Sequence, residues 1–360
     1  MLRTWIVRLL VVVLCAPCLV VMGGDAALAA EPPPTPLVTW GQWGQDPGEF
    51  YWLEWVAVAP GGDVFTTEFW GQRVQRFSPD GTLLDHWGSY GEGPGEFTAP
   101  EGIAIDDDGF LYVVDGYEVQ KHTTDGTLVT EWGGWGQSDG LFQSPAGIAV
   151  DDDGYVYVVD QGNNRIQKFT ADGTFVTTWG NPNPLPGSAN GQFDNPEGIA
   201  VHDGTVYVVD SFNHRVQRFS TTGTFLGAWG TNGTGPGQFQ GPKGVGIDAA
   251  GNAYVSDYGN DRIQKFTATG TFVSTWGEEG SDLGEFNDPH GVAVDETSGD
   301  LYVAELNNNR VQAFGYRGGQ MPRSRRVQQG SWWARTSTTP PASTRPVGAR
   351  LPGAARSPTS

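Results

Sequence analysis

Residues 145–180 contain four short runs in which apolar residues cluster or alternate with polar ones: GIAV, YVYVV, RIQKF and TFVTTW. Asp, Asn and Gly fill the gaps between these runs, as in DDDG, DQGNN and ADG. Runs of this length, rich in Val, Ile, Tyr, Phe and Thr and bounded by turn residues, predict antiparallel strands joined by hairpins. One such meander cannot bury both of its faces, so the pattern also predicts neighbours of the same kind.

The same unit recurs along most of the chain. A Trp-Gly pair closes each copy at intervals of 45 to 50 residues, and a Gly-x-Phe segment follows each pair. The tryptophans are Trp40, Trp87, Trp132, Trp179, Trp229 and Trp276, and the phenylalanines are Phe50, Phe97, Phe142, Phe193, Phe239 and Phe286. Six repeats of four strands predict an all-β, six-bladed β-propeller, because radial repetition leaves only short, protected sheet edges.

The two ends of the repeated region complement each other. Residues 37–41 match the fourth strand of the other repeats, whereas the last repeat, from Phe286 to Phe314, has no fourth strand of its own. We therefore expect the N-terminal strand to complete the C-terminal blade and close the ring. A further set of phenylalanines, found in five of the six repeats, is expected to pack between the blades: Phe77, Phe169, Phe219, Phe266 and Phe314.

The order of motifs, PxGIAVD, VYVVD, NxRIQKF and a GTF strand ending in Trp-Gly, resembles the NHL repeat family over residues 37–316. The resemblance implies a six-bladed propeller of the kind found in secreted bacterial proteins, commonly a non-catalytic binding module for a protein, peptide or glycan. More distantly, the chain resembles the peptidyl-amidoglycolate lyase propeller, which binds zinc through His residues at first-strand positions. Only the DPHG segment around His290 retains that feature here, so a site of three His residues is not available.

The N-terminal residues 1–30 read as a signal peptide, with Arg3 and Arg8 before an apolar core at residues 9–21 and an Ala-Leu-Ala cleavage site. That core is too short for a membrane span. Both cysteines, Cys15 and Cys18, lie in this leader, so the mature protein is expected to have no disulfide or thiolate site. A Pro-rich linker follows at residues 31–36. These features predict a secreted or extracytoplasmic protein with no membrane span.

Charge divides the chain into an acidic propeller and a basic tail. Residues 317–360 contain eight Arg and no Asp or Glu, and the whole chain carries −20, so residues 1–316 carry −28. The tail is rich in Pro, Ser, Thr and Gly, which predicts disorder. An acidic propeller disfavours a nucleic-acid partner, including RNA binding of the kind seen in TRIM-NHL proteins, because phosphate contacts require a cationic face.

A repeated acid, Asn and Arg mark the turn between the second and third strands of most repeats. Asp160, Asn163 and Arg165 are one set, and Gly71 stands at the Asn position in the first repeat. Asn alternating with Gly predicts a positive φ at that position. We interpret the acid as an acceptor for turn amides and a partner for the guanidinium. The alternative is a ring of acids that binds cations.

Functional residues are expected where the repeats differ, because what varies between blades is not required by the blade. The residue before the first-strand glycine changes with each repeat, in the order Glu54, Glu101, Ala146, Glu197, Lys243 and His290. The first strand of a propeller blade lines the central channel, so these side chains should converge at its mouth, where perturbed pKa values are expected. The segment 181–190 lengthens one loop, and we expect it to overhang this mouth.

Two classes of function remain open at this mouth. The first is a binding module that uses Glu54, Glu101, Glu197, Lys243 and His290. The second is a metal-dependent lyase or hydrolase, in which Glu54, Glu101 and Glu197 hold the metal and His290 or Lys243 acts as a base. The sequence identifies no cofactor. If a divalent cation binds, calcium is favoured over zinc because the ligands are hard oxygens.

The grouped glutamates can be accommodated in several ways. Like charges in a partly desolvated site are tolerated with a cation, a basic ligand or shared protons. The alternative is that the glutamates are solvated and line a water-filled channel.

Overall fold

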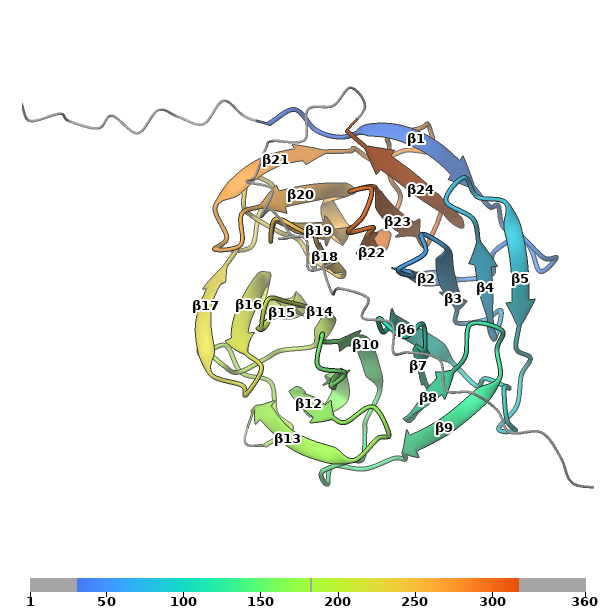
Figure 1. The fold of residues 1–360 in the computed structure, drawn as a ribbon. Helices are drawn as coiled ribbons and strands as arrows, with labels where there is room; N and C mark the ends of the chain where they lie inside the picture. The colour runs from blue at the N-terminus through green and yellow to red at the C-terminus, as the bar shows by residue number, and fades with distance from the viewer. Residues whose placement is uncertain (1–30, 182, 317–360) are drawn as a thin grey trace, which may run out of the picture. The chain divides into compact units, whose positions relative to one another are not determined.

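The computed structural model describes residues 31–181 and 183–316, so the expected signal peptide at 1–30 and the basic tail at 317–360 lie outside the described residues. The described chain forms six four-stranded antiparallel sheets. Figure 1 shows these sheets arranged as blades around a common axis, with the first strand of each blade innermost. The predicted six-bladed β-propeller is therefore confirmed.

The blades follow one another in chain order. Blade 1 comprises β2 (Leu53–Val58), β3 (Val64–Glu68), β4 (Arg73–Phe77) and β5 (Leu83–Trp87). Blade 2 comprises β6 (Pro100–Ile105), β7 (Leu111–Asp115), β8 (Glu118–His122) and β9 (Leu128–Gly133). Blade 3 comprises β10 (Pro145–Val150), β11 (Val156–Asp160), β12 (Arg165–Phe169) and β13 (Phe175–Gly180).

Blade 4 comprises β14 (Pro196–His202), β15 (Thr205–Asp210), β16 (Arg215–Ser220) and β17 (Phe225–Trp229). Blade 5 comprises β18 (Val245–Ile247), β19 (Ala253–Asp257), β20 (Arg262–Phe266) and β21 (Phe272–Trp276). Blade 6 comprises β22 (Pro289–Val294), β23 (Leu301–Glu305), β24 (Arg310–Gly315) and β1 (Thr35–Trp40). Short 3₁₀ turns follow the second strands of blades 3, 4 and 5: η1 (Gln161–Asn163), η2 (Ser211–Asn213) and η3 (Tyr258–Asn260). No helix in the described ranges has the length and apolarity to cross a membrane.

Strand β1 closes the ring. It pairs antiparallel with β24, placing Trp40 opposite Val311, and the Thr39 hydroxyl donates to the Val311 carbonyl at 3.0 Å. The prediction that the N-terminal strand completes the C-terminal blade is confirmed. The last blade thus depends on residues more than 270 positions apart in sequence.

The hydrophobic core consists of clusters between neighbouring blades. Phe169 packs with Val114 and Val119 of blade 2, and Phe219 packs with Tyr157 and Val159 of blade 3. The predicted inter-blade role is confirmed for all five phenylalanines, Phe77, Phe169, Phe219, Phe266 and Phe314, whereas blade 2 has His122 at this position. Each ring is essentially buried, so these contacts contribute a large hydrophobic stabilisation to every interface.

The first-strand glycines allow the blades to approach closely at the axis. A Cβ added to Gly147 would lie 2.3 Å from the Glu197 carbonyl oxygen, and one added to Gly244 would lie 2.3 Å from that of His290. These positions tolerate only glycine because backbone, rather than a flexible side chain, occupies the space. Blade 1 carries Trp55 instead, and its indole joins the core between blades 1 and 2.

The repeated acid of the turn is structural. Asp160 is fully buried, and its carboxylate accepts from Arg165 Nε at 2.7 Å, from Asn163 Nδ2 at 2.8 Å and from the Gln143 main-chain amide at 2.8 Å. Gln167 Nε2 donates to the same group at 3.1 Å. Protein donors therefore occupy this carboxylate, which confirms the structural interpretation over the cation-binding ring at this position.

One detail of the turn prediction was wrong. The left-handed residue is not Asn163 but the next one, Asn164, with a φ of 52°. The amide of Asn163 serves instead to bind Asp160 and the Gly136 carbonyl oxygen. At Gly71 a Cβ would lie 2.6 Å from Glu68 Oε2, so lack of space, rather than a positive φ, accounts for that glycine.

Candidate ligand site at the ring axis

A β-bulge positions the variable residue of most blades. The pairing of first and second strands shifts between Pro145 and Ile148 in blade 3 and between Pro196 and Ile199 in blade 4. Equivalent shifts occur in blades 1, 2 and 6. Bulges bend a strand and redirect a side chain. They lie on the innermost strands of Figure 1, and we call the six variable residues the axial residues: Glu54, Glu101, Ala146, Glu197, Lys243 and His290.

Glu197 and Lys243 form an ion pair between blades 4 and 5. Lys243 Nζ lies 2.5 Å from Glu197 Oε1, and Asn195 Nδ2 donates to the same oxygen at 2.9 Å. The Glu197 residue is only 4 % exposed. Burial raises the pKa of Glu197, whereas the Lys243 charge and the two hydrogen bonds oppose that rise. The ammonium group also lies 5.2 Å from the centre of the Tyr258 ring, a cation–π contact.

Glu54 and Glu101 lack such a counter-charge. Trp52 Nε1 donates to Glu54 Oε1 at 2.8 Å, and Glu101 has no hydrogen-bond partner for its carboxyl group among the described residues. Burial raises the pKa of Glu54 to about 7, and the Glu197 charge adds to the rise. Burial, followed by the charges of Glu54 and Glu197, raises the pKa of Glu101 well above its usual value. Burial therefore favours the protonated form of both carboxyl groups.

His290 is neutral at this site. Its residue is 8 % exposed, and its ring contacts the Trp55 indole edge to face at 5.3 Å between centres. Burial, with the Lys243 charge, lowers the pKa of His290 to about 3, and Nδ1 has no hydrogen-bond partner. A base this weak is poorly matched to proton abstraction near pH 7. The geometry therefore favours a packing or ligand-contact role for His290 over the predicted catalytic one.

The charged axial residues lie close enough to influence one another's pKa values. The charges of Glu197 and Lys243 act on both Glu54 and Glu101, and the Lys243 charge acts on His290. No group of three His, Cys, Asp or Glu side chains suited to hold a metal ion occurs in the described ranges. The expected metal set of Glu54, Glu101 and Glu197 is thus not assembled as ligands, because Glu197 is turned to Lys243 instead.

The sequence argument missed the groups that orient the axial residues. The side chain of the residue after each repeated Asn accepts a hydrogen bond from a main-chain amide of the next blade. The residue that donates this amide lies two positions before an axial residue. Asn164 Oδ1 accepts from the Asn195 amide at 2.9 Å, and Asp261 Oδ1 accepts from the Asp288 amide at 3.0 Å. His214 and Asn309 make the corresponding contacts with Gly241 and Trp52. The signal was present in the sequence, since all four have side chains that can accept a hydrogen bond.

The long loop at residues 181–190 is hydrogen-bonded to Asn164, the same residue that accepts the Asn195 amide. Asn164 Nδ2 donates to the Pro184 carbonyl oxygen at 2.8 Å. The Asn181 side chain bridges both main-chain groups of Phe193, at 2.7 Å and 3.0 Å. Leu185 in this loop is 72 % exposed. Whether the loop overhangs the axial residues stays a prediction.

Comparison with known proteins places the repeats in a family. The NHL repeat model matches residues 142–169, 193–219, 239–266 and 286–314, which correspond to four of the six repeats. The chain therefore contains four NHL repeats. No curated protein matches its sequence.

Solved structures share the architecture of this propeller at low identity. A streptogramin B lyase structure is 18 % identical with a TM-score of 0.53, covering 76 % of this chain and 80 % of its own. A Bacteroides thetaiotaomicron protein of unknown function is 18 % identical with a TM-score of 0.58, covering 77 % of this chain and 74 % of its own. An auxiliary nutrient binding protein of the same organism is 15 % identical with a TM-score of 0.55, covering 75 % and 70 %. Identities this low show a common fold and nothing further.

Proposed function

We propose that this protein is an extracytoplasmic, non-catalytic binding module that holds a protein, peptide or glycan on the loop face around the ring axis. In this proposal, Glu54 and Glu101 receive a positively charged group of the ligand, beside the Glu197–Lys243 pair. The leader-like residues 1–30 support the location. The shared architecture of a nutrient binding protein is compatible with a binding role.

The carboxyl group of Glu101 carries the proposal. It has no hydrogen-bond partner among the described residues, and its pKa is raised well above the ordinary value by burial and by neighbouring carboxylates. A buried polar group without a partner costs free energy that a complementary ligand recovers. An ammonium or guanidinium group would favour the ionised carboxylate, so ligand binding should release protons from Glu101 and Glu54.

A metal-dependent lyase or hydrolase remains the second candidate, with Ca²⁺ or Zn²⁺ at the same carboxylates. It has less support, because Glu197 is paired with Lys243 and His290 is a weak base. Calcium and zinc therefore serve as separate arms of the test.

Isothermal titration calorimetry with 1,5-diaminopentane, CaCl₂ or ZnCl₂ tests this proposal near pH 7. The diamine should give binding heat that changes between two buffers of different ionisation enthalpy, because protons are released. The variant Glu101→Gln should lose this heat. Asp203→Asn, which alters a carboxylate with a 90 % exposed side chain, should retain it.

Three results would contradict the proposal. They are no heat with the diamine in the wild type, equal heat in Glu101→Gln, and heat that does not depend on the buffer. Binding heat with calcium or zinc alone, abolished in Glu101→Gln, would replace the cationic-ligand proposal with the metal alternative.

A further inference from the structure

Exposed aromatic rings gather at one repeat position in the loops that lead into blades 1, 2 and 3. We call these the lead-in loops, residues 41–50, 88–97 and 133–142. Trp43 is 69 % exposed, Tyr90 is 75 % exposed and Trp135 is 67 % exposed. Each forms the same isolated bridge, pairing with Phe50, Phe97 and Phe142 respectively. The three rings thus stand on equivalent, hydrogen-bonded backbone positions in consecutive blades.

The fold itself does not require an aromatic residue at this position. Asn232 and Glu279 occupy it in the loops leading into blades 5 and 6, and both make the same bridge, to Phe239 and Phe286. Trp43 contacts the Tyr51 ring edge to face at 6.3 Å between centres, but most of the Trp43 surface stays in water, so this contact alone adds little stabilisation. Exposed rings that recur at one repeat position in three consecutive blades indicate a binding surface.

Other rings extend this surface toward the axis. Trp52 is 42 % exposed, Trp70 is 50 % exposed and Tyr117 is 49 % exposed. The turn that carries Trp70 is hydrogen-bonded to the lead-in segment of blade 1, since the Phe69 and Gly71 amides donate to Trp52 and Tyr51. In blade 2, the Gly134 amide donates to the Tyr117 carbonyl oxygen at 2.7 Å, which places that turn beside the loop of Trp135.

We propose that this aromatic arc, Trp43, Tyr90 and Trp135, binds an electrically neutral polysaccharide by stacking sugar rings on the aromatic faces. Single rings with small or polar neighbours, such as Gln42 and Gly44 beside Trp43, suit separate sugar units rather than one continuous apolar partner surface. In the same loop, Gln42 Nε2 donates to Glu49 Oε1 at 2.7 Å, and the amide oxygen of the exposed Gln42 side chain can accept a hydrogen bond from a sugar hydroxyl group. Rings at equivalent positions of successive blades match a polymer with a repeating unit.

The negative net charge of the protein favours a neutral polysaccharide over the other ligands that stack on aromatic rings. Nucleic-acid bases also stack on such platforms, but they need a cationic groove for their phosphates. Residues 1–316 carry −28 within a chain of −20 that ends in eight Arg, so an anionic polymer or membrane surface is repelled. A neutral glycan is not repelled by this charge.

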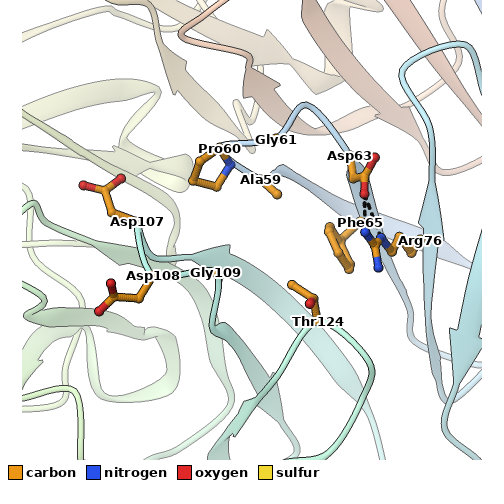
Figure 2. Close-up of a pocket in the computed structure, with 10 residues that line it drawn as sticks. All are labelled: Ala59, Pro60, Gly61, Asp63, Phe65, Arg76, Asp107, Asp108, Gly109 and Thr124. Carbon is orange, nitrogen blue, oxygen red and sulfur yellow. Dashed lines mark hydrogen bonds and ion pairs between the residues drawn. The ribbon is translucent and has the colours of Figure 1, made fainter.

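The pocket at the opposite loops does not compete with this surface. Figure 2 shows it between the β2–β3 and β6–β7 turns, lined in part by Asp63, Arg76 and Asp108. Its volume is about 240 Å³. Arg76 is already paired with Asp63 through Nε at 2.8 Å, so its charge is neutralised within the protein.

The inference rests on the proposed binding function but uses different side chains. Full-length secreted protein is tested for retention on cellulose, chitin and mannan, and by affinity electrophoresis in laminarin and xylan gels. At least one neutral polysaccharide should retain the wild type. Trp43→Ala and Trp135→Ala should each weaken its binding about tenfold, a typical loss for one stacking ring.

Two further variants test the inference, one as a control and one that should bind the polysaccharide more tightly. Asn232→Ala changes the same repeat position in a loop without a ring and should leave binding unchanged. Glu279→Trp adds a ring to the loop that leads into blade 6, next in order around the ring to the loop of Trp43, and should tighten binding. Matched circular dichroism and melting curves establish that each variant is folded.

The outcomes separate this inference from the axial proposal. Binding of no polysaccharide, or binding unchanged in both Trp variants, overturns the inference. Ring-dependent binding to phosphatidylcholine vesicles and to no glycan would assign the arc to a membrane surface instead. Loss of diamine heat in Glu101→Gln with intact glycan binding tests the axial site alone.

Discussion

At the scale of single residues, protonation determines how three glutamates share the ring axis. Lys243 lies 2.5 Å from Glu197 and opposes the rise that burial causes in the Glu197 pKa, whereas the pKa of Glu54 rises to about 7 and that of Glu101 rises well above its usual range. A folded protein that binds protons more tightly than its unfolded chain loses stability as pH rises. For Glu54 that window runs from the ordinary pKa of 4.5 to about 7, and the raised pKa of Glu101 adds a loss of stability in the same direction.

We therefore expect the double variant Glu54→Gln, Glu101→Gln to flatten the pH dependence of stability. Between about pH 5 and about pH 8, the wild type should lose roughly 1 to 3 kcal/mol more unfolding free energy than the variant, because each pKa unit is worth about 1.4 kcal/mol before screening. Urea unfolding at both pH values measures this. His290, whose pKa is lowered to about 3, contributes the opposite slope below its ordinary pKa of 6.5, and it does so equally in both proteins. Identical slopes would show that these carboxyl groups are ionised at little cost.

At the scale of elements, the blade interface is the unit that the sequence repeats. Four of the six interfaces combine a buried aromatic cluster, a glycine that permits close backbone approach and a side chain that accepts a main-chain amide from the next blade. Gly198 shows the second feature, since a Cβ there would lie 2.4 Å from the Lys243 carbonyl oxygen. The axial residues follow these contacts directly in the chain, so their positions depend on correct packing of adjacent blades.

Deleting residues 31–41 should destabilise the whole ring. The deletion removes β1 and leaves β24 as an unpaired edge, and it also removes Trp40, which packs against Phe77 at 5.8 Å between ring centres. Loss of a buried aromatic side chain alone costs about 3 to 5 kcal/mol, and an exposed strand edge promotes aggregation. Thermal unfolding and size-exclusion chromatography measure the effect. A melting temperature equal to that of the wild type would mean that blade 6 does not need its outer strand.

At the scale of the whole molecule, net charge opposes compactness. Residues 31–316 carry a net charge of −29, because residues 1–30 contribute +1 to the −28 of residues 1–316. No cysteine occurs among the described residues, so no disulfide holds the described ring together. Most repeated acids are nevertheless neutralised locally, as Glu305 is by Arg310 Nε at 2.6 Å. The remaining repulsion acts between exposed carboxylates, where added salt screens it effectively.

Raising NaCl from about 20 mM to about 300 mM should therefore increase the melting temperature, because the Debye length falls from about 20 Å to about 6 Å. Differential scanning calorimetry at pH 8 measures the shift, and an equal concentration of a neutral osmolyte serves as the control. A melting temperature that falls with salt would show that local ion pairs, rather than net repulsion, dominate the electrostatics. Binding of a neutral glycan to the aromatic arc should change little over the same range.

The repeated pattern alone determined the six-bladed fold, the closing strand and the residues that vary at the axis. Equivalent positions in repeated sequence segments take equivalent places in a propeller, so Glu54, Glu101, Glu197, Lys243 and His290 could be assigned to one layer without coordinates. The burial of the phenylalanines and the hydrogen bonding of Asp160 could be predicted in the same way. Repeated blades need the same turn hydrogen bonds and the same apolar packing between neighbours.

Only the tertiary structure decided how the axial side chains pair. Glu197 and Lys243 are 46 positions apart in sequence, and periodicity gives no sign that the lysine neutralises this glutamate rather than Glu54 or Glu101. The left-handed residue of the turn was also misplaced by one position, because Asn at two adjacent positions offers two chemically similar choices. Such pairings depend on the direction of individual side chains across a blade interface. Sequence spacing specifies which residues are equivalent, whereas the three-dimensional contacts between blades determine which of them meet.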